Sequence, residues 1–136
     1  MVAPMNDETR QKLVQQAANA RQWAYVPYSH YAVGAALLTA SGKVYEGVNI
    51  ENAAYPVTVC AERVAVFKAV SEGERQFEAI AVVTSNGGAP CGSCRQVLSE
   101  FGLSTLVIIA DETGQIHQEL TVGDLLPGAF TPADLA

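Results

Sequence analysis

Apolar residues recur along the chain with two different periods, which predicts alternating helices and strands. The first apolar set repeats at helical spacing, with Gln and Arg on the opposite face, and Asn6 or Asp7 can cap this helix. Its members are Leu13, Ala17, Ala20 and Ala24. Pro27 disfavours helix at the residue before it, so we expect the helix to have ended by that point.

Five apolar stretches have the length and composition of strands. They are residues 32–39, 44–50, 79–84, 105–110 and 116–120. Ser41-Gly42 is a turn signal that predicts a hairpin between the first two, and Gly114 turns the chain into the fifth. The third stretch is apolar without interruption, which is typical of a central strand covered on both faces.

Two further helices are predicted between these strands, and a short one follows them. Residues 61–70 are apolar almost all round and end before Gly73, so this helix must be buried on every side, by its own sheet or by another subunit. A second helix over 92–101 follows Pro90 and ends at Gly102. Thr121 and Asp124 have the spacing of a capping box for a short final helix.

The order of these elements, α-β-β-α-β-α-β-β-α, predicts an α/β fold with a mixed five-stranded sheet and helices on its faces. The 136 residues are enough for one compact domain, and 49% of them are hydrophobic, so a sizeable core can form. No apolar run is long enough to span a membrane, and residues 1–10 lack the apolar stretch of a signal peptide. We therefore expect no membrane partner.

Charge argues against a nucleic-acid partner. The net charge is −6, and the eight Lys and Arg residues are spread along the chain, whereas a polynucleotide surface needs clustered basic residues. A small neutral substrate is favoured instead. The odd number of cysteines, three, and their CxxC pair argue against a disulfide framework and for a reducing compartment, which predicts a cytoplasmic protein.

All three cysteines lie in two short segments, Cys60-Ala61-Glu62 and Pro90-Cys91-Gly92-Ser93-Cys94. Cys91 and Cys94 are three apart at the predicted start of a helix, which puts both thiols on one face. Three thiolates can hold a zinc ion and leave its fourth position open for water, as catalytic zinc sites do. Glu62 can move protons to and from such a water. A redox couple or a structural zinc site would account for the CxxC pair alone.

The segments spell CxE followed by PCxxC, and this pattern resembles that of the zinc-dependent nucleoside and nucleobase deaminases, with Cys60 in the place of a histidine. Other parts are similar to the small homotetrameric cytidine deaminases, and the resemblance runs from Asn6 to Leu135. These parts are residues 28–38, 49–56 and 125–130.

The resemblance implies a single cytidine deaminase-like domain over residues 1–136 with a three-layer α-β-α fold, and one zinc ion held by Cys60, Cys91 and Cys94. It implies hydrolytic deamination of cytidine and deoxycytidine to uridine and deoxyuridine with release of ammonia, which serves pyrimidine salvage. The resemblance thus implies a hydrolase that acts on a cyclic amidine C–N bond. In the implied reaction, zinc-bound hydroxide attacks C4 of the cytosine ring and Glu62 transfers the protons.

The resemblance also assigns the substrate pocket. Tyr31 stands where the family commonly has Phe and would flank the base, while the backbone of Ala61 contacts it. Asn49 and Glu51 would bind the ribose 3′-hydroxyl, and they point one way if the segment is extended. Two aromatic residues would reach into the pocket of a neighbouring subunit of a homotetramer. They are Tyr55 and Phe130.

Zn²⁺ with three thiolates carries excess negative charge, which weakens its action on a bound water. Helix N-termini at the two motifs offset part of it. Arg63 and Arg95 each follow a motif directly and are candidates to donate hydrogen bonds to the sulfurs.

Other functions remain open at this point. A relative could act on a modified cytosine nucleoside such as blasticidin S, although Asn49 and Glu51 favour an ordinary ribose or deoxyribose. A polynucleotide-editing deaminase conflicts with the charge balance. A zinc-stabilised binding module without catalysis would unfold when its zinc is removed.

Overall fold

The structure is a computed structural model that describes residues 5–135, so residues 1–4 and 136 of the predicted 1–136 domain lie outside the described part. Nine helices and strands follow one another in the predicted order within this range. They are α1 (Asp7–Ala20), β1 (Gly34–Thr39), β2 (Val44–Val48), α2 (Ala61–Ser71), β3 (Phe77–Thr84), α3 (Gly92–Ser99), β4 (Leu106–Asp111), β5 (Ile116–Thr121) and α4 (Val122–Leu125). Three short 3₁₀ turns cover Arg21–Trp23, Tyr55–Val57 and Pro132–Leu135.

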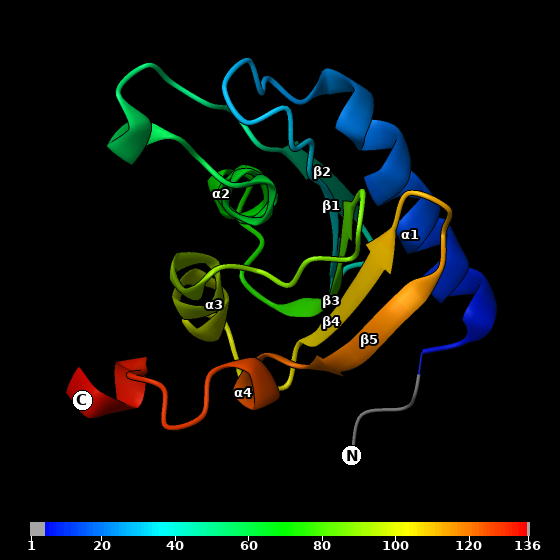
Figure 1. The fold of residues 1–136 in the computed structure, drawn as a ribbon. Coiled ribbons are helices and arrows are strands. Elements are labelled where there is room, and N and C mark those ends of the chain that lie inside the picture. Colours follow the sequence, from blue (N-terminus) through cyan, green and yellow to red (C-terminus); the bar gives the residue numbers. More distant parts are fainter. Residues whose placement is uncertain (1–4, 136) are drawn as a thin grey trace.

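The five strands form one mixed sheet in the order β2-β1-β3-β4-β5 (Figure 1). Strands β3 and β4 are parallel, and the other three pairs are antiparallel. The predicted mixed five-stranded α/β sheet is thereby confirmed. Since β2 and β3 are each antiparallel to β1, they run in the same direction although they are not neighbours.

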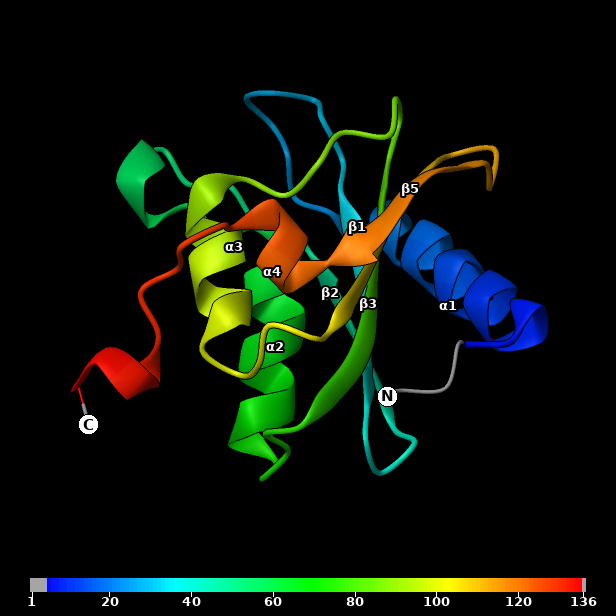
Figure 2. The same ribbon diagram turned by 90° about the horizontal axis from the view of Figure 1, so that it is seen from below.

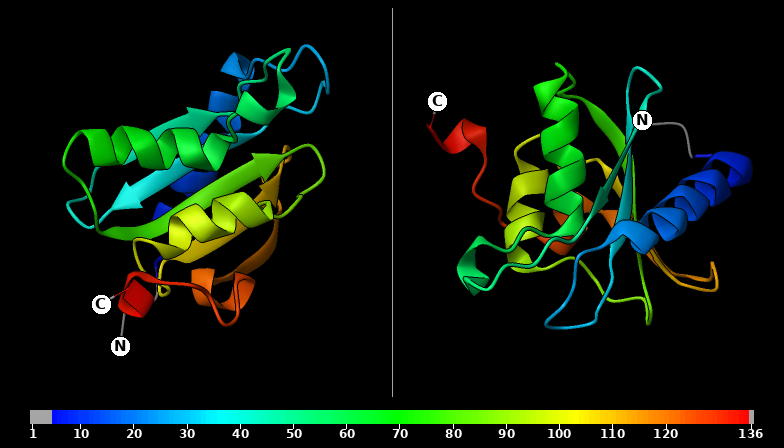
Figure 3. Two further views of the ribbon diagram at one scale, coloured as in Figure 1. Left: turned by 90° about the vertical axis from the view of Figure 1, so that its left-hand side faces the viewer. Right: turned by 90° about the horizontal axis from the view of Figure 1, so that it is seen from above.

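Helices cover both faces of the sheet. Helix α1 lies alone on one face, and α2 and α3 lie side by side on the other, with α4 next to α3 (Figures 2 and 3). The fold is therefore the predicted three-layer α-β-α arrangement. Each face has its own cluster of buried apolar residues, one against α1 and one against α2 and α3.

Strand β3 shows how one apolar run supplies both clusters. Successive side chains of a strand point to opposite faces. Ile80 and Val82 accordingly pack toward α2 and α3, while Ala79, Ala81 and Val83 pack toward α1. All five are nearly inaccessible to solvent, which confirms that this uninterrupted run is a central strand.

The helix ends follow the predicted local chemistry. The Asn6 side chain accepts a hydrogen bond of 2.8 Å from the Thr9 backbone and caps α1. Gly73 follows α2 with a φ of 91°, the left-handed conformation expected after a helix. Thr121 and Asp124 form the capping box of α4.

Some element ends differ from the prediction. Helix α1 stops at Ala20, and Ala24 follows a 3₁₀ turn instead of continuing the helical face. Strand β1 begins at Gly34 and not at residue 32, because the Asn49 side chain binds the backbone of Tyr31 and Val33. Strand β2 stops at Val48 instead of residue 50.

Helix α2 approaches the sheet closely at Gly47 of β2. A Cβ atom at this position would lie 2.3 Å from the Ala61 carbonyl oxygen and 2.6 Å from the Ala65 nitrogen. Only glycine fits there without displacing the first turn of α2, which carries the Cys60-Ala61-Glu62 segment.

Within residues 5–135, none of the helices combines the length and apolar character needed to cross a bilayer.

Candidate metal centre and substrate pocket

The three cysteines meet at the N-termini of two helices. Cys60 is the N-cap residue of α2, Cys91 is the N-cap residue of α3, and Cys94 lies in the first turn of α3. Both helices follow strands that run in the same direction, so their N-termini lie at the same edge of the sheet. The three sulfur atoms lie within 4.8 Å of one another.

The sulfur cluster fits one zinc ion. Sulfur ligands about 2.3 Å from a tetrahedral zinc lie about 3.8 Å apart. The Cys60 and Cys91 sulfurs are 3.8 Å apart, and the Cys91 and Cys94 sulfurs are 3.5 Å apart. A set of three thiolates leaves the fourth position of a tetrahedral ion for a water or a substrate.

Hydrogen bonds between the cysteines shift the pKa values of their thiols in opposite directions. A hydrogen bond from Cys94 and another from Arg63 lower the pKa of Cys60 to about 5, against the opposing effect of burial. The same hydrogen bond and burial raise the pKa of Cys94 far above its usual range. A divalent cation bound to the sulfurs takes the place of the shared protons, so metal binding releases protons here.

Glu62 is buried beside these sulfurs, with 4% of its surface exposed, in the first turn of α2. Burial raises its pKa to about 7, and the nearby Cys60 charge acts in the same direction. A carboxyl group that titrates near neutral pH can both accept and release a proton under the same conditions. Glu62 thus has the position and the titration behaviour of a general acid–base group.

The two arginines that follow the motifs have different contacts. Arg63 Nη2 donates a hydrogen bond of 3.4 Å to the Cys60 sulfur, as expected. Its Nε is buried and has no hydrogen-bond partner within residues 5–135. Arg95, expected to donate to a sulfur, donates instead to the backbone carbonyls of Pro90 at 2.8 Å and Leu125 at 2.9 Å. Through these two hydrogen bonds, Arg95 connects the start of α3 to α4.

A cavity of about 270 Å³ opens beside the sulfur cluster. Cys60, Glu62 and Cys91 line it together with residues from the segments before β1, after β2 and after β3. Four of the predicted substrate-binding residues are in its lining. They are Tyr31, Asn49, Glu51 and Ala61.

Asn49 and Glu51 both face this cavity but have different partners. The Asn49 side chain donates to the Tyr31 carbonyl at 2.8 Å and accepts from the Val33 N–H at 2.9 Å. Glu51 accepts from the Tyr28 and Ser29 N–H groups at 3.0 and 3.1 Å, and also from the Ser29 hydroxyl. The Ser29 hydroxyl bond lowers the pKa of Glu51, so this side chain is an ionised acceptor.

Sequence reasoning missed Ser29, which lines the cavity and holds Glu51. Thr84 and Gly88, on the opposite wall, were missed as well. The spacing of these residues carries no signal for a pocket, because tertiary contacts alone bring them together.

Tyr55 and Phe130 lie outside this cavity in the single chain. Tyr55 is 68% exposed, and its ring contacts that of Tyr28 edge-on with centroids 5.6 Å apart. Phe130 is 58% exposed in the segment after α4, where its carbonyl accepts a 2.9 Å hydrogen bond from Gln96. Both rings thus present apolar surface outward.

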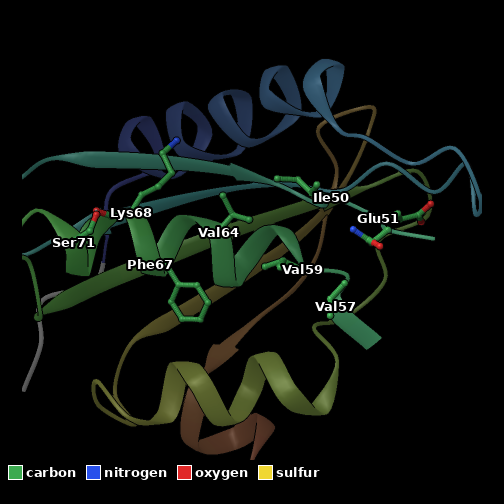
Figure 4. Close-up of a pocket in the computed structure, with 9 residues that line it drawn as sticks. Ile50, Glu51, Val57, Val59, Val64, Phe67, Lys68 and Ser71 are labelled. Carbon is green, nitrogen blue, oxygen red and sulfur yellow. The ribbon is translucent and has the colours of Figure 1, made fainter. Parts of the chain in front are cut away.

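A larger hollow of about 430 Å³ lies on the outer side of α2, and none of the three cysteines is in its lining (Figure 4). Val64 and Phe67 from α2 and Val57 and Val59 from the preceding segment line it. Its walls are mostly apolar, and the group of metal ligands found within residues 5–135 is the cysteine cluster beside the smaller cavity, so that cavity has the residues for chemistry.

Comparison with known proteins agrees with this geometry. Residues 7–110 match the family model described as the cytidine and deoxycytidylate deaminase zinc-binding region. The cytidine deaminase of Halalkalibacterium halodurans is 54% identical over 129 residues, covering 93% of this chain and 97% of the relative. The cytidine deaminase of Sporosarcina psychrophila is 52% identical over 129 residues, covering 93% and 94%.

Solved structures show the same fold. The crystal structure of cytidine deaminase from Burkholderia pseudomallei has a TM-score of 0.85 and 46% identity, covering 93% of this chain and all of that chain. The cytidine deaminase from Mycobacterium tuberculosis has a TM-score of 0.80 and 40% identity, covering 93% and 98%. The chain belongs to the zinc-binding family of cytidine and deoxycytidylate deaminases.

Proposed function

We propose that this chain hydrolyses cytidine and deoxycytidine to uridine and deoxyuridine and releases ammonia. The observation that carries the proposal is the buried Glu62 beside three sulfurs, in a cavity open to a small molecule. The two named relatives that are more than half identical over 129 aligned residues are cytidine deaminases, which supports the same substrate class here.

The residues divide the chemistry between them. A zinc ion held by Cys60, Cys91 and Cys94 supplies Lewis acidity that makes a water molecule nucleophilic at neutral pH. Glu62 accepts a proton from the attacking water as the new C4–O bond forms, and delivers it to N3 of the cytosine ring. Glu62 then moves the second water proton to the amino group as the C4–N bond breaks, so that ammonia leaves.

The remaining cavity residues bind the nucleoside. The Tyr31 ring would stack against the base, and the backbone of Ala61 would contact the polar edge of the base. The ionised Glu51 would accept a hydrogen bond from the ribose 3′-hydroxyl, with Asn49 in support. A nucleotide chain extending from that hydroxyl would meet the Glu51 carboxylate, which agrees with the net charge of −6.

A substrate panel tests this proposal. We expect turnover of cytidine and deoxycytidine, and little or none of cytidine inside an RNA oligomer. Faster turnover of blasticidin S than of either nucleoside would replace the proposed substrate by a modified cytosine nucleoside. Efficient turnover of the RNA oligomer would contradict the proposed role of Glu51.

Replacing Arg63 by Ala should leave the fold intact but lower kcat and move its pH dependence to higher pH. The Cys60 sulfur loses the 3.4 Å hydrogen bond that offsets its negative charge. The loss of one charge-assisted hydrogen bond predicts about a tenfold change. Steady-state rates across pH measure it, with the exposed Arg75→Ala as control. An unchanged kcat and pH profile in Arg63→Ala would remove Arg63 from this role.

We propose further that the enzyme is a homotetramer whose subunits complete one another's pockets. Tyr55 and Phe130 are exposed aromatic residues that this chain does not bring to its own cavity. Phe67 is 52% exposed on the outer side of α2, a helix whose composition predicts burial on every side (Figure 4). Apolar surface of this kind favours contact with another copy of the chain.

Complementation between two inactive variants tests the sharing. In a mixed oligomer of Glu62→Gln and Phe130→Ala chains, a site with an intact Glu62 can receive Phe130 from its neighbour. Random assembly would complete about a quarter of the sites. We therefore expect unfolding and refolding of the mixture to restore activity that neither variant has alone. No gain over the separate variants would contradict a shared pocket.

We propose the cytoplasm as the site of action and pyrimidine salvage as the role. A reducing compartment keeps the three cysteines available as metal ligands, and they are free and gathered in one cluster in this structure.

A further inference from the structure

Tyr31 is bonded to the loop that follows β3. Its hydroxyl donates a hydrogen bond of 2.6 Å to the Asn86 side-chain oxygen, 55 residues away in the chain. Tyr31 belongs to the wall of the cavity formed by the segment before β1, and Thr84 and Gly88 to the wall formed by the loop after β3. The hydrogen bond therefore connects two walls of the cavity beyond the last paired residues of β1 and β3, Gly34 and Val83.

The loop is arranged internally to receive this hydroxyl. The Thr84 hydroxyl lies 3.3 Å from the same Asn86 oxygen and accepts a 2.8 Å hydrogen bond from the Gly88 N–H. A Cβ atom on Gly88 would lie 2.6 Å from the Tyr31 hydroxyl oxygen, so the absence of a side chain there makes room for it. The Tyr31 hydroxyl, Asn86, Thr84 and Gly88 form one connected group.

The loop also rests on the hairpin formed by β4 and β5. Gly87 has a φ of 75°, and a Cβ atom on it would lie 2.7 Å from Nδ1 of His117. The His117 ring is itself held by a 2.7 Å contact between its Nε2 and Asp111. The loop 84–88 thus lies against His117 on one side and is hydrogen-bonded to Tyr31 on the other, so it forms a fixed wall of the cavity.

We infer that Asn86 is a positioning residue for nucleoside binding, acting through the Tyr31 hydroxyl to fix both the aromatic ring and the loop 84–88. Asn86 is not itself in the lining of the cavity. Asn86 instead pre-organises the wall of the cavity that includes the Tyr31 ring. The stacking of this ring on the base rests on the proposed function. A pre-organised wall lowers the ordering cost of binding, so the effect belongs in KM and not in the chemical step.

A double-mutant cycle tests this inference. Tyr31→Phe keeps the ring and removes the hydroxyl, while Asn86→Ala removes the acceptor. We expect each variant to raise KM for cytidine about fivefold, the typical worth of one hydrogen bond, with kcat within about twofold of the wild type. The double variant should be no worse than either single one, because all three lack the same bond.

Hydrogen exchange gives a readout that does not depend on turnover. The Gly88 amide should exchange faster in all three variants, because its hydrogen bond to Thr84 belongs to the same group. Tyr25→Phe and Asn19→Ala change exposed side chains that are not in the lining of the cavity, so they serve as matched controls and should behave as the wild type.

Additive effects of the two substitutions on KM, or unchanged exchange at Gly88 in Asn86→Ala, would overturn the inference. A wild-type protein that deaminated no cytosine nucleoside would instead overturn the proposed function. In that case the exchange rates would still decide whether the Tyr31–Asn86 bond fixes the loop.

Discussion

Replacing Glu62 by Gln should reduce kcat for cytidine by about three orders of magnitude while zinc content stays at the wild-type level. Gln has nearly the same size as Glu and is neutral, so it can fill the buried position without a charge. It cannot accept a proton from water or deliver one to N3 and the amino group. Steady-state rates and metal analysis on the same preparations measure both effects.

The matched control is Glu78→Gln, which makes the same chemical change at an exposed position near the start of β3. We expect this variant to keep wild-type kcat and KM. Near-normal turnover in Glu62→Gln would show that another group moves the protons, and loss of zinc in that variant would leave Glu62 with a structural role instead.

Replacing Cys94 by Ser should abolish both zinc binding at micromolar concentrations and activity. Cys94 is fully buried, and its sulfur is one of three that lie within 4.8 Å of one another. A serine hydroxyl at this position is a far weaker zinc ligand than a thiolate. The variant should also have a lower Tm, because zinc at 1,000 times its Kd stabilises a native protein by about 4 kcal/mol.

Chelation of the wild-type protein should imitate this variant and should be reversible. The chain has a buried apolar cluster on each face of its sheet, so we expect the zinc-free protein to stay folded. Added zinc should restore activity to the chelated wild type but not to Cys94→Ser. The neighbouring Ser93→Ala, at an exposed position, is the control that should keep its zinc. Global unfolding upon chelation would favour a zinc-stabilised module instead.

Most of the fold could be predicted from local chemistry. The confirmed features depend on residues that are close together in the chain. They are the uninterrupted apolar run of β3, the Asn6 cap, Gly73 and the capping box at Thr121. The misplaced ends of β1 and β2 depend instead on the Asn49 side chain and on bridges from Ile50 to Tyr25 and Val59. Such long-range competition for backbone groups has no local signal. That the chain forms a single domain remains a prediction.

The same distinction between local and long-range contacts applies to the candidate site. The spacing of Cys91 and Cys94 predicts that their thiols lie together, since helix geometry puts residues three apart on one face. Cys60 joins them because α2 and α3 begin at the same edge of the sheet. The contacts of Arg95 with two carbonyls and the Tyr31–Asn86 bond depend on how loops meet. The roles of Tyr55 and Phe130 depend on a second subunit and remain predictions.

The most direct test of the central claim follows the ultraviolet absorbance of cytidine incubated with purified protein of known zinc content, beside Glu62→Gln at equal zinc content. We expect the cytidine spectrum to change to that of uridine, with release of ammonia, for the wild type alone and at about one zinc per chain. An unchanged cytidine spectrum at full zinc occupancy would contradict cytidine deamination by this site.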